Sequence, residues 1–240
     1  MGAAAGRGAA RPAPPPDAAE PGMTGAANWR EAARAAAYDA AMAEGAERGE
    51  GPFNYRWEHV RAVVKLAGWL ARALDADADV VEAAAWLHDV RKSAPEHALA
   101  GAREARRILA DTDLPREQIA QVADAIEKHE GLFRETPVEP LEAAILWDAD
   151  KLSKLGATAF LHWLAVGYLS HDSTEALMAD NEAWLRSVQP RMAASMNTGP
   201  ARAEARRRLR AMGAFHAALA RELTLEDHVG DAVADADDEE

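Results

Sequence analysis

The stretch DADVVEAAAWLHDVRK, residues 77–92, predicts a helix that carries polar side chains at the end of an apolar face. Val81, Ala84 and His88 recur at the three- and four-residue spacing that places side chains on one side of a helix. His88 therefore extends the stripe that faces the interior, and Asp89 follows it directly. A buried imidazole or carboxylate is costly unless it is paired or binds a metal. The stretch thus predicts a helical fold and an interior polar site together.

Helical periodicity continues through most of the chain, and almost no segment has the strict alternation of a strand. A clear break, SMNTGP, separates the last two expected helices. No interior stretch reads as a linker, so we expect an all-α fold, a single compact multi-helix bundle. The expected helices cover 28–47, 55–74, 77–90, 95–110, 115–129, 141–155, 157–170, 174–188 and 201–223.

Both ends of the chain differ in composition from its middle. Residues 1–26 are rich in Ala and Pro and lack large apolar side chains, so we expect a disordered tail, within which Met23 is an alternative start. Residues 226–240 are acidic and equally poor in large apolar groups, and a second disordered tail is expected there. The helical domain is therefore expected over residues 27–225.

Charge and composition restrict the partners. The formal net charge of -13 argues against a large nucleic-acid footprint, which needs clustered Lys and Arg, but it permits a small phosphorylated substrate in a local basic pocket. The chain has no cysteine, which excludes disulfides and thiolate zinc sites. No apolar run approaches the roughly 18 residues of a membrane span, and the N-terminus lacks a secretory apolar core. We expect a cytoplasmic protein, with oligomerisation left open.

Three further polar side chains lie on apolar helix faces in the same way. His59 shares its face with Val63, Leu66 and Leu70, and His129 extends the stripe of Ile119, Val122 and Ile126. Asp150 follows Leu146 and Trp147 by four and three residues. Alone, each is more readily explained as a satisfied core residue. Together, His59, His88, Asp89 and Asp150 are best explained by joint binding of Mn, Fe, Co, Ni or Mg, because mixed imidazole and carboxylate ligands suit these ions.

The order H59, H88-D89, D150 resembles the H…HD…D signature of the HD superfamily of metal-dependent phosphohydrolases, with a signature core over residues 55–157. HDVRK (88–92) is similar to the common HD-x-x-K form, and DADKLSKLGA (148–157) is similar to a DADRLDALGA segment of bacterial members. That pattern selects Asp150 over Asp148 as the ligand. Ser153 departs from it, because an Asp is usual there. MNTGPARAEARRRLRAMGAFHAALAREL (196–223) resembles the C-terminal helix of small bacterial HD hydrolases.

The resemblance also implies a possible second metal, held by His97 and His129 with Asp89 as the bridge. EHALAGA (96–102) and AIEKHEG (125–131) fall where binuclear members place two further histidines. The alternative is that His97 only caps or decorates the helix that starts near Pro95. One or two ions per chain are therefore both expected. The remaining histidines match no motif position and are expected to be structural or surface residues: His162, His171, His216 and His228.

Basic residues near the signature are the candidates for phosphate binding. Lys92, one turn past His88, is the first candidate for a catalytic role beside Asp89 and for substrate binding, and Lys151 is the second. Arg61 and Arg56 are weaker candidates near His59. Residues 202, 206, 207, 208 and 210 form an Arg-rich face that is more often solvated, and Asp124 or Glu127 could orient a water or a ligand histidine.

The resemblance implies hydrolysis of a phosphoester or phosphoanhydride, commonly in a nucleotide, by a metal-activated water. A non-catalytic HD module that binds a nucleotide or a protein partner is the alternative. A helical scaffold with accidental histidines is a third reading. No aromatic clamp or base-reading motif can be assigned from the sequence, so it does not identify the substrate.

Overall fold

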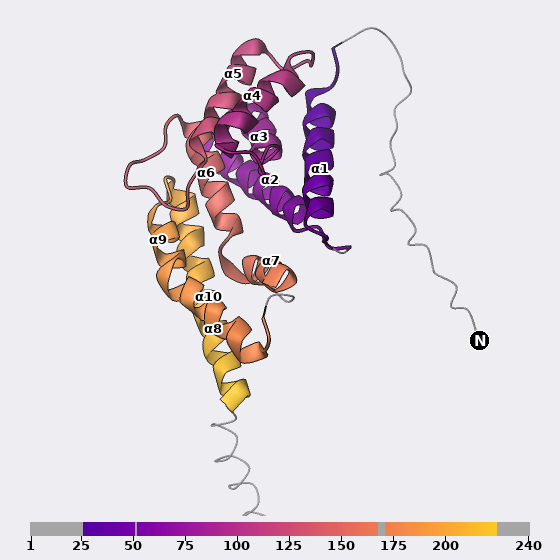
Figure 1. Ribbon diagram of the computed structural model, residues 1–240. Helices are drawn as coiled ribbons and strands as arrows, with labels where there is room; N and C mark the ends of the chain where they lie inside the picture. The colour runs from indigo at the N-terminus through magenta and orange to yellow at the C-terminus, as the bar shows by residue number, and fades with distance from the viewer. Residues whose placement is uncertain (1–25, 51, 168–170, 225–240) are drawn as a thin grey trace, which may run out of the picture.

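The computed structural model describes residues 26–50, 52–167 and 171–224, and within these ranges it is all-helical (Figure 1). The only pairing of strand type there is an isolated bridge between Ala27 and Thr112. The expected all-α bundle is confirmed. The tails expected over 1–26 and 226–240 lie almost entirely outside the described residues. The helices are α1 Trp29–Glu47, α2 Tyr55–Leu74, α3 Ala78–Leu87, α4 His97–Leu109, α5 Arg116–Lys128, α6 Leu141–Ser153, α7 Gly156–Gly167, α8 Thr174–Ser187, α9 Gln189–Ala194 and α10 Gly199–Thr224.

Helix α6 is the centre of the bundle. Every residue from Ala143 to Ser153 is buried, and the helix packs on α2, α3 and α5 on one side and on α9 and α10 on another. A helix that is buried all round belongs to the interior of a domain. Its two aspartates and its lysine must therefore find partners inside the protein.

Small residues allow the helices around α6 to approach closely. Helix α1 buries Ala33, Ala37 and Ala41 at four-residue spacing, and α3 buries the consecutive residues 83–85. Gly101 of α4 lies where an added Cβ would come within 3.3 Å of the backbone oxygen of His88. Close packing of this kind holds the ends of α3 and α4 in fixed positions.

Side-chain caps set the starts of the helices that carry the polar residues. The Asn54 side chain accepts from the Trp57 amide at 2.8 Å at the start of α2. Asp77 accepts from the amides of Asp79 and Val80, both at 3.1 Å, at the start of α3. Such caps satisfy amides that have no partner within the helix.

Several predicted boundaries were wrong. Helix α3 ends at Leu87, so His88 is its C-cap and Asp89 lies in the following turn, not on a continuing helix. Helix α4 begins at His97, because Glu96 adopts a left-handed backbone with φ of 48°. The short helix α9 was not expected, and α10 begins at Gly199 instead of 201.

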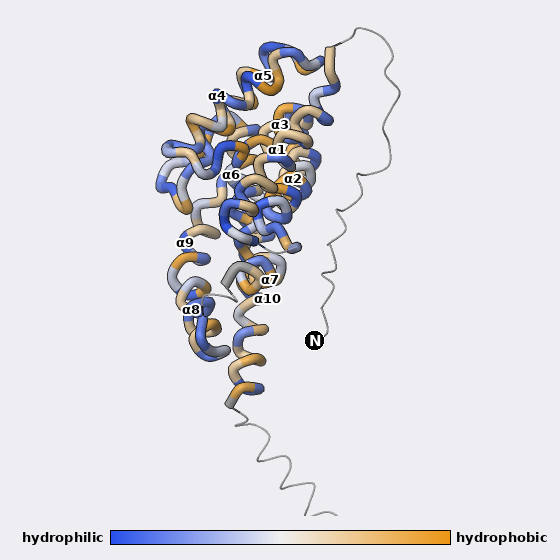
Figure 2. Tube along the Cα trace, turned by 45° about the vertical axis from the view of Figure 1, so that its right-hand side comes forward, coloured by the Kyte–Doolittle hydropathy of each residue, from blue (hydrophilic) through white to orange (hydrophobic). Residues whose placement is uncertain are grey.

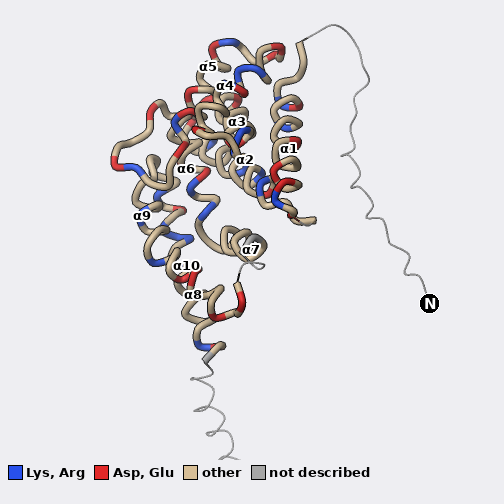
Figure 3. Tube along the Cα trace, in the orientation of Figure 1, with Lys and Arg blue, Asp and Glu red and all other residues tan. Residues whose placement is uncertain are grey.

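The last helices form a second group beside the first. Figure 1 shows α8 and α10 extending away from the group formed by α1 to α6, with α7 near the junction. Hydrophobic and hydrophilic stretches occur in both groups in Figure 2, and Figure 3 shows no charged residue on α7. No helix within the described ranges has the length and apolar character needed to span a bilayer.

Candidate metal centre

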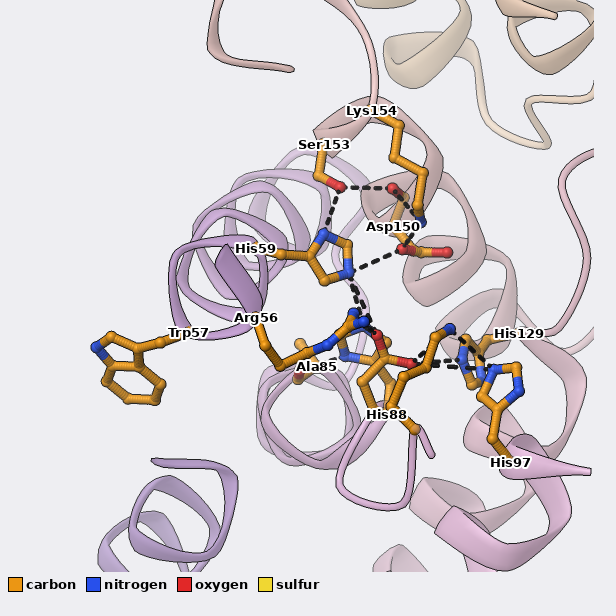
Figure 4. Close-up of polar contacts among 12 residues, drawn as sticks. Arg56, Trp57, His59, Ala85, His88, His97, His129, Asp150, Ser153 and Lys154 are labelled. Atoms are coloured by element: carbon orange, nitrogen blue, oxygen red, sulfur yellow. Dashed lines mark hydrogen bonds and ion pairs between the residues drawn. The ribbon is translucent and has the colours of Figure 1, made fainter. Parts of the chain in front are cut away.

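The structure brings His59 of α2, His88 at the end of α3, Asp89 and Asp150 of α6 into one buried cluster (Figure 4). The Nε2 atoms of His59 and His88 are 3.2 Å apart. His59 Nε2 lies 3.5 Å from Asp89 Oδ2 and 3.3 Å from Asp150 Oδ1. None of the four residues is more than 5% exposed. His59, His88 and Asp89 therefore lie close enough together to share an ion, and Asp150 adjoins them through its contact with His59.

The other ring nitrogens show which atoms of the imidazoles are available. His88 Nδ1 donates to the backbone oxygen of Ala85 at 2.8 Å. His59 Nδ1 donates to Ser153 Oγ at 3.1 Å, because that hydroxyl itself donates to the backbone oxygen of Asp150 at 2.7 Å. When neither Nε2 atom is protonated, their lone pairs face each other and repel. A cation between them relieves this repulsion, and two nitrogens on one such ion lie about 3 Å apart.

Asp89 faces a second set of ligands with its other oxygen. Asp89 Oδ1 lies 3.5 Å from His129 Nε2 and 3.9 Å from His97 Nε2. His129 Nδ1 donates to the backbone oxygen of Ile126, so its Nε2 also carries a lone pair. Asp89 Oδ1 and His129 Nε2 are buried and have no hydrogen-bond partner within the described ranges. Two such acceptors side by side fit a second cation bridged by Asp89, although Lys92 Nζ lies 3.2 Å from the same oxygen.

The charges of the two carboxylates are maintained in spite of their burial. Burial raises the pKa of Asp89, but the positive charge of protonated imidazoles, that of His88 foremost, and the hydrogen bonds that they then donate more than offset it and hold the pKa well below its usual range. For Asp150, burial is outweighed by Lys151 and Lys154, which likewise hold its pKa well below the usual range. Both groups are therefore ionised at neutral pH and suited to binding a cation.

Arg56 is closer to the cluster than its sequence position indicated. Its Nη1 donates to Asp89 Oδ2 at 2.5 Å, and its Nε donates to Glu44 of α1 at 2.9 Å. Arg61, the other arginine expected near the site, is not brought to it. Its side chain is 55% exposed and pairs with Glu58, because its position is about 200° around α2 from the ligand histidine.

Three lysines surround the carboxylates in different ways. Lys92 Nζ lies 3.2 Å from Asp89 Oδ1 and 3.2 Å from His97 Nε2, with its side chain one-third exposed. Lys151 is enclosed: it donates to Asp150 Oδ2 at 2.5 Å and to the backbone oxygen of His129 at 2.9 Å. Burial lowers the pKa of Lys151 to about 8. Its role in substrate binding stays a prediction. Its contacts link Asp150 of α6 to the end of α5.

Lys154 is a site residue that the sequence reasoning missed. It forms an ion pair with Asp150 Oδ1 and also reaches the backbone oxygen of that residue at 3.3 Å. The four-residue spacing from Asp150 was the available signal, since residues so spaced meet on one helix face.

Asp148 points away from the buried cluster. Its Oδ1 accepts from the amide of Asn197 at 2.7 Å, and its Oδ2 accepts from the amide of Thr198 at 2.8 Å. Burial raises the pKa of Asp148, and these hydrogen bonds act against the rise. Asp148 thus secures the start of α10, and Asp150 is left as the aspartate of α6 that faces the cluster.

Three of the five arginines on the Arg-rich face of α10 make structural contacts: Arg202, Arg207 and Arg208. Arg208 Nη1 donates to the backbone oxygen of Leu152 at 2.8 Å, and Arg207 pairs with Glu204 at 2.7 Å. Asp124 pairs with Lys128 on α5. Of the other histidines, His171 pairs with Asp180, His216 with Asn181, and His162 packs edge-on to Tyr55 at 5.9 Å, while His228 lies outside the described residues.

Two cavities adjoin the cluster. The first, of about 470 Å³, lies between the end of α1 and the turn after α3, where Asp89, Lys92 and Glu44 line it. The second, of about 390 Å³, lies beyond Ser153 and Lys154 toward α7 and α8. Asp89 in the first cavity and Lys154 in the second connect these spaces with the cluster.

Comparison with known proteins gives a consistent picture. A family model, the HD domain, matches residues 56–155. The structure of Bacillus subtilis YpgQ is 19% identical over 81% of this chain and 95% of that chain, with a TM-score of 0.59. The structure of YpgQ in complex with ADP is 21% identical and covers 79% of this chain and 97% of that chain, with a TM-score of 0.57.

An HD-superfamily hydrolase from Bacillus thuringiensis is 22% identical over 82% of this chain and 99% of that chain, with a TM-score of 0.59. At these identities the likeness shows a shared fold. No curated protein matches the sequence.

Proposed function

Because this chain is a member of the HD-domain superfamily, we propose that it is a metal-dependent phosphohydrolase that cleaves a phosphoester or phosphoanhydride bond of a nucleotide. The observation that carries the proposal is the face-to-face arrangement of imidazole lone pairs and carboxylates in a buried cluster. Such an arrangement is costly without a cation and favourable with one.

The ligands divide between the two oxygens of Asp89. His59, His88 and Asp150 would hold one divalent ion on the Oδ2 side, and His97 with His129 would hold another on the Oδ1 side. When bound, such an ion lowers the pKa of a water molecule and neutralises charge on phosphate oxygens. Ser153 and the backbone oxygens of Ala85 and Ile126 fix the tautomers that ligation requires.

Cationic side chains of this chain would bind the phosphates. Lys92 is one-third exposed at the edge of the cluster, and Lys154 lies between the cluster and the second cavity. Arg56 is inside the cluster against Asp89 and would limit where a phosphate can enter. Positive charge at these positions stabilises the negative charge that develops on transferred phosphoryl groups. Bacillus subtilis YpgQ, which has this fold, binds ADP, and this supports a nucleotide substrate here.

The test is turnover by the metal-loaded protein. We expect hydrolysis of p-nitrophenyl phosphate or of members of a nucleotide panel with Mn, Co, Ni or Mg, abolished by chelation and restored by adding the ion back. The Asp89→Asn variant should fold, lose its metal and lose activity by about 10³-fold or more, since it removes the bridging charge.

Asp148→Asn is the matched control, because Asp148 lies on the same buried helix as Asp150 but faces α10. It should keep its metal. A protein that binds nucleotides tightly but turns over none of them with any ion would instead be a non-catalytic binding module.

A further inference from the structure

The second cavity has walls that come from six helices and reach the proposed metal ligands. Tyr55 of α2 and Ser153 and Lys154 at the end of α6 form the wall toward the cluster. Ser153 contacts His59, and Tyr55 stacks on the same imidazole with centroids 6.0 Å apart and an interplanar angle of 22°. A ligand in this cavity therefore lies one side chain away from the proposed metal site.

The opposite walls are aromatic. The rings of Phe160 and Trp163 of α7 stack with their centroids 6.0 Å apart and an interplanar angle of 25°. Trp184 of α8 and Met212 of α10 complete the surface. Helix α7 has no charged residue, as Figure 3 shows. Aromatic faces and a thioether bind planar rings well, because stacking adds to the gain from burying apolar area.

Two buried amides interrupt these apolar walls. Gln189, the first residue of α9, is 5% exposed and lines the cavity, and its Oε1 has no hydrogen-bond partner within the described ranges. Asn181 of α8 is 4% exposed, and its Oδ1 accepts from His216 at 2.7 Å. A buried acceptor without a partner is unfavourable, and a donor on a ligand would remove that cost.

The cavity has the size and layout for the ring system of a nucleotide whose phosphates lie at the cluster. Its volume of about 390 Å³ exceeds what a purine ring needs and leaves room for part of a sugar. Lys154 stands between the aromatic walls and Asp150, where a phosphate attached to that sugar would pass.

We propose that this cavity binds the base of the substrate nucleotide and that Gln189 selects a base carrying an exocyclic amino group by accepting a hydrogen bond from it. The proposal rests on the proposed function for the identity of the substrate but concerns a separate surface. An adenine ring satisfies the orphaned oxygen. A hypoxanthine ring, which has a carbonyl in place of the amino group, sets one acceptor against another.

The experiment measures binding of adenosine monophosphate and inosine monophosphate to the metal-loaded protein by titration calorimetry. Quenching of tryptophan fluorescence gives a second readout, because Trp163 and Trp184 line the cavity. We expect the adenine nucleotide to bind about tenfold more tightly, which is the effect of one buried hydrogen bond. Gln189→Met, which keeps the size of the side chain but removes the acceptor, should bring the ratio close to one.

A second variant protects the test against misfolding at Gln189. Ala159→Phe fills the cavity from α7 without touching a proposed metal ligand, so it should weaken binding of both nucleotides by about tenfold or more while metal content per chain is kept. Thermal unfolding of each variant verifies that the fold is intact.

The outcomes separate this inference from the proposed function. Equal binding of the two nucleotides, or a preference that Gln189→Met leaves intact, overturns the inference. Turnover of p-nitrophenyl phosphate without any binding of either nucleotide also overturns it, yet leaves a phosphohydrolase. A preference for adenine that depends on Gln189, in a protein that hydrolyses no phosphate compound, supports the inference and overturns the proposed function.

Discussion

The cluster around Asp89 and the cavity beside it share a wall but are built from opposite kinds of residue. In the cluster, charged and imidazole groups are buried among closely packed alanine-rich helices, and Asp89 is 5% exposed. In the group formed by α7, α8 and α10, large apolar residues remain open to solvent, with Leu161 at 63% and Phe215 at 41% exposure.

The difference follows from what each region is proposed to do. Metal ligands must be held to within a fraction of an ångström, so their helices pack tightly and each imidazole has a second partner that orients it. A surface that binds a planar ring needs area and a few polar atoms, and it tolerates looser packing. Chemistry is thus assigned to the rigid group of helices, and selection of the substrate to the more open one.

The largest expected effect on activity comes from replacing one of the two histidines that flank Tyr55, and the other histidine serves as its control. His59→Ala should remove the metal of the Oδ2 side and lower kcat by about 10³-fold, because a ligand and its charge balance are lost. His162→Ala, on the cavity side, should keep its metal and raise KM for nucleotides a few-fold. Metal analysis and steady-state kinetics measure the metal content, kcat and KM of both variants. Equal losses of metal in the two variants would show that the cluster and the cavity do not have separate roles.

The next largest effect tests whether the cluster binds a second metal ion. His129→Ala should reduce bound metal from two ions per chain to one and lower kcat by about 10²-fold, since the second ion shares the charge of the substrate phosphate. His171→Ala, in which the lost imidazole pairs with Asp180, serves as the control and should keep both ions. A single ion per chain in the unaltered protein would contradict the bridging role of Asp89.

A smaller effect is expected at the shared wall. Ser153 holds the His59 ring through Nδ1, so Ser153→Ala should weaken metal binding by about 10-fold or somewhat more. Competition with a fluorescent chelator measures the affinity directly. Ser153→Thr keeps the hydroxyl and should therefore keep most of the metal affinity. If Ser153→Thr behaves like Ser153→Ala, the hydroxyl does not position the imidazole.

The smallest expected effect is on thermal stability and comes from an ion pair of α10, on the cavity side. Hydrogen bonds from Arg207, together with Arg208, lower the pKa of Glu204 to about 2 from an ordinary value of 4.5. A carboxyl with a lowered pKa stabilises the fold fully above its ordinary pKa and loses that contribution as pH falls toward 2. The difference in Tm between the protein and Glu204→Gln should therefore be constant above about pH 5 and shrink below it. A difference independent of pH would exclude the ionised carboxyl as its cause.

The sequence predicted the cluster better than the cavity for a physical reason. Histidine or aspartate on an apolar helix stripe is visible in a linear pattern, because burial of such a group demands a partner. The residues His59, His88, Asp89 and Asp150 could thus be listed before their helices were placed. The HD-domain match over 56–155 and the all-α fold bear out the family and the fold class. The roles of the residues remain predictions.

The cavity was invisible in the sequence because its parts are ordinary core residues until they are assembled. Phe160, Trp184 and Gln189 lie on three separate helices, and no spacing rule relates them. Arg56 shows the same limit at the cluster, since its contact with Asp89 depends on how helices cross. Lys154 is different, because its four-residue spacing from Asp150 was a usable signal that the sequence reasoning missed. Local backbone also escaped prediction: the left-handed Glu96, which delays α4 to His97, has no strong sequence signal.

Helix α6 presents its two aspartates to different neighbours, and this has an outcome that hydrogen-exchange experiments can detect. Asp150 would be restrained by an ion, while Asp148 is joined to the backbone amides of Asn197 and Thr198. Any stiffening of α6 by the ion is therefore passed to amides about fifty residues further along the chain. Deuterium uptake at Asn197 and Thr198 should slow when metal is added, so these two amides would report occupancy of a site that they do not touch.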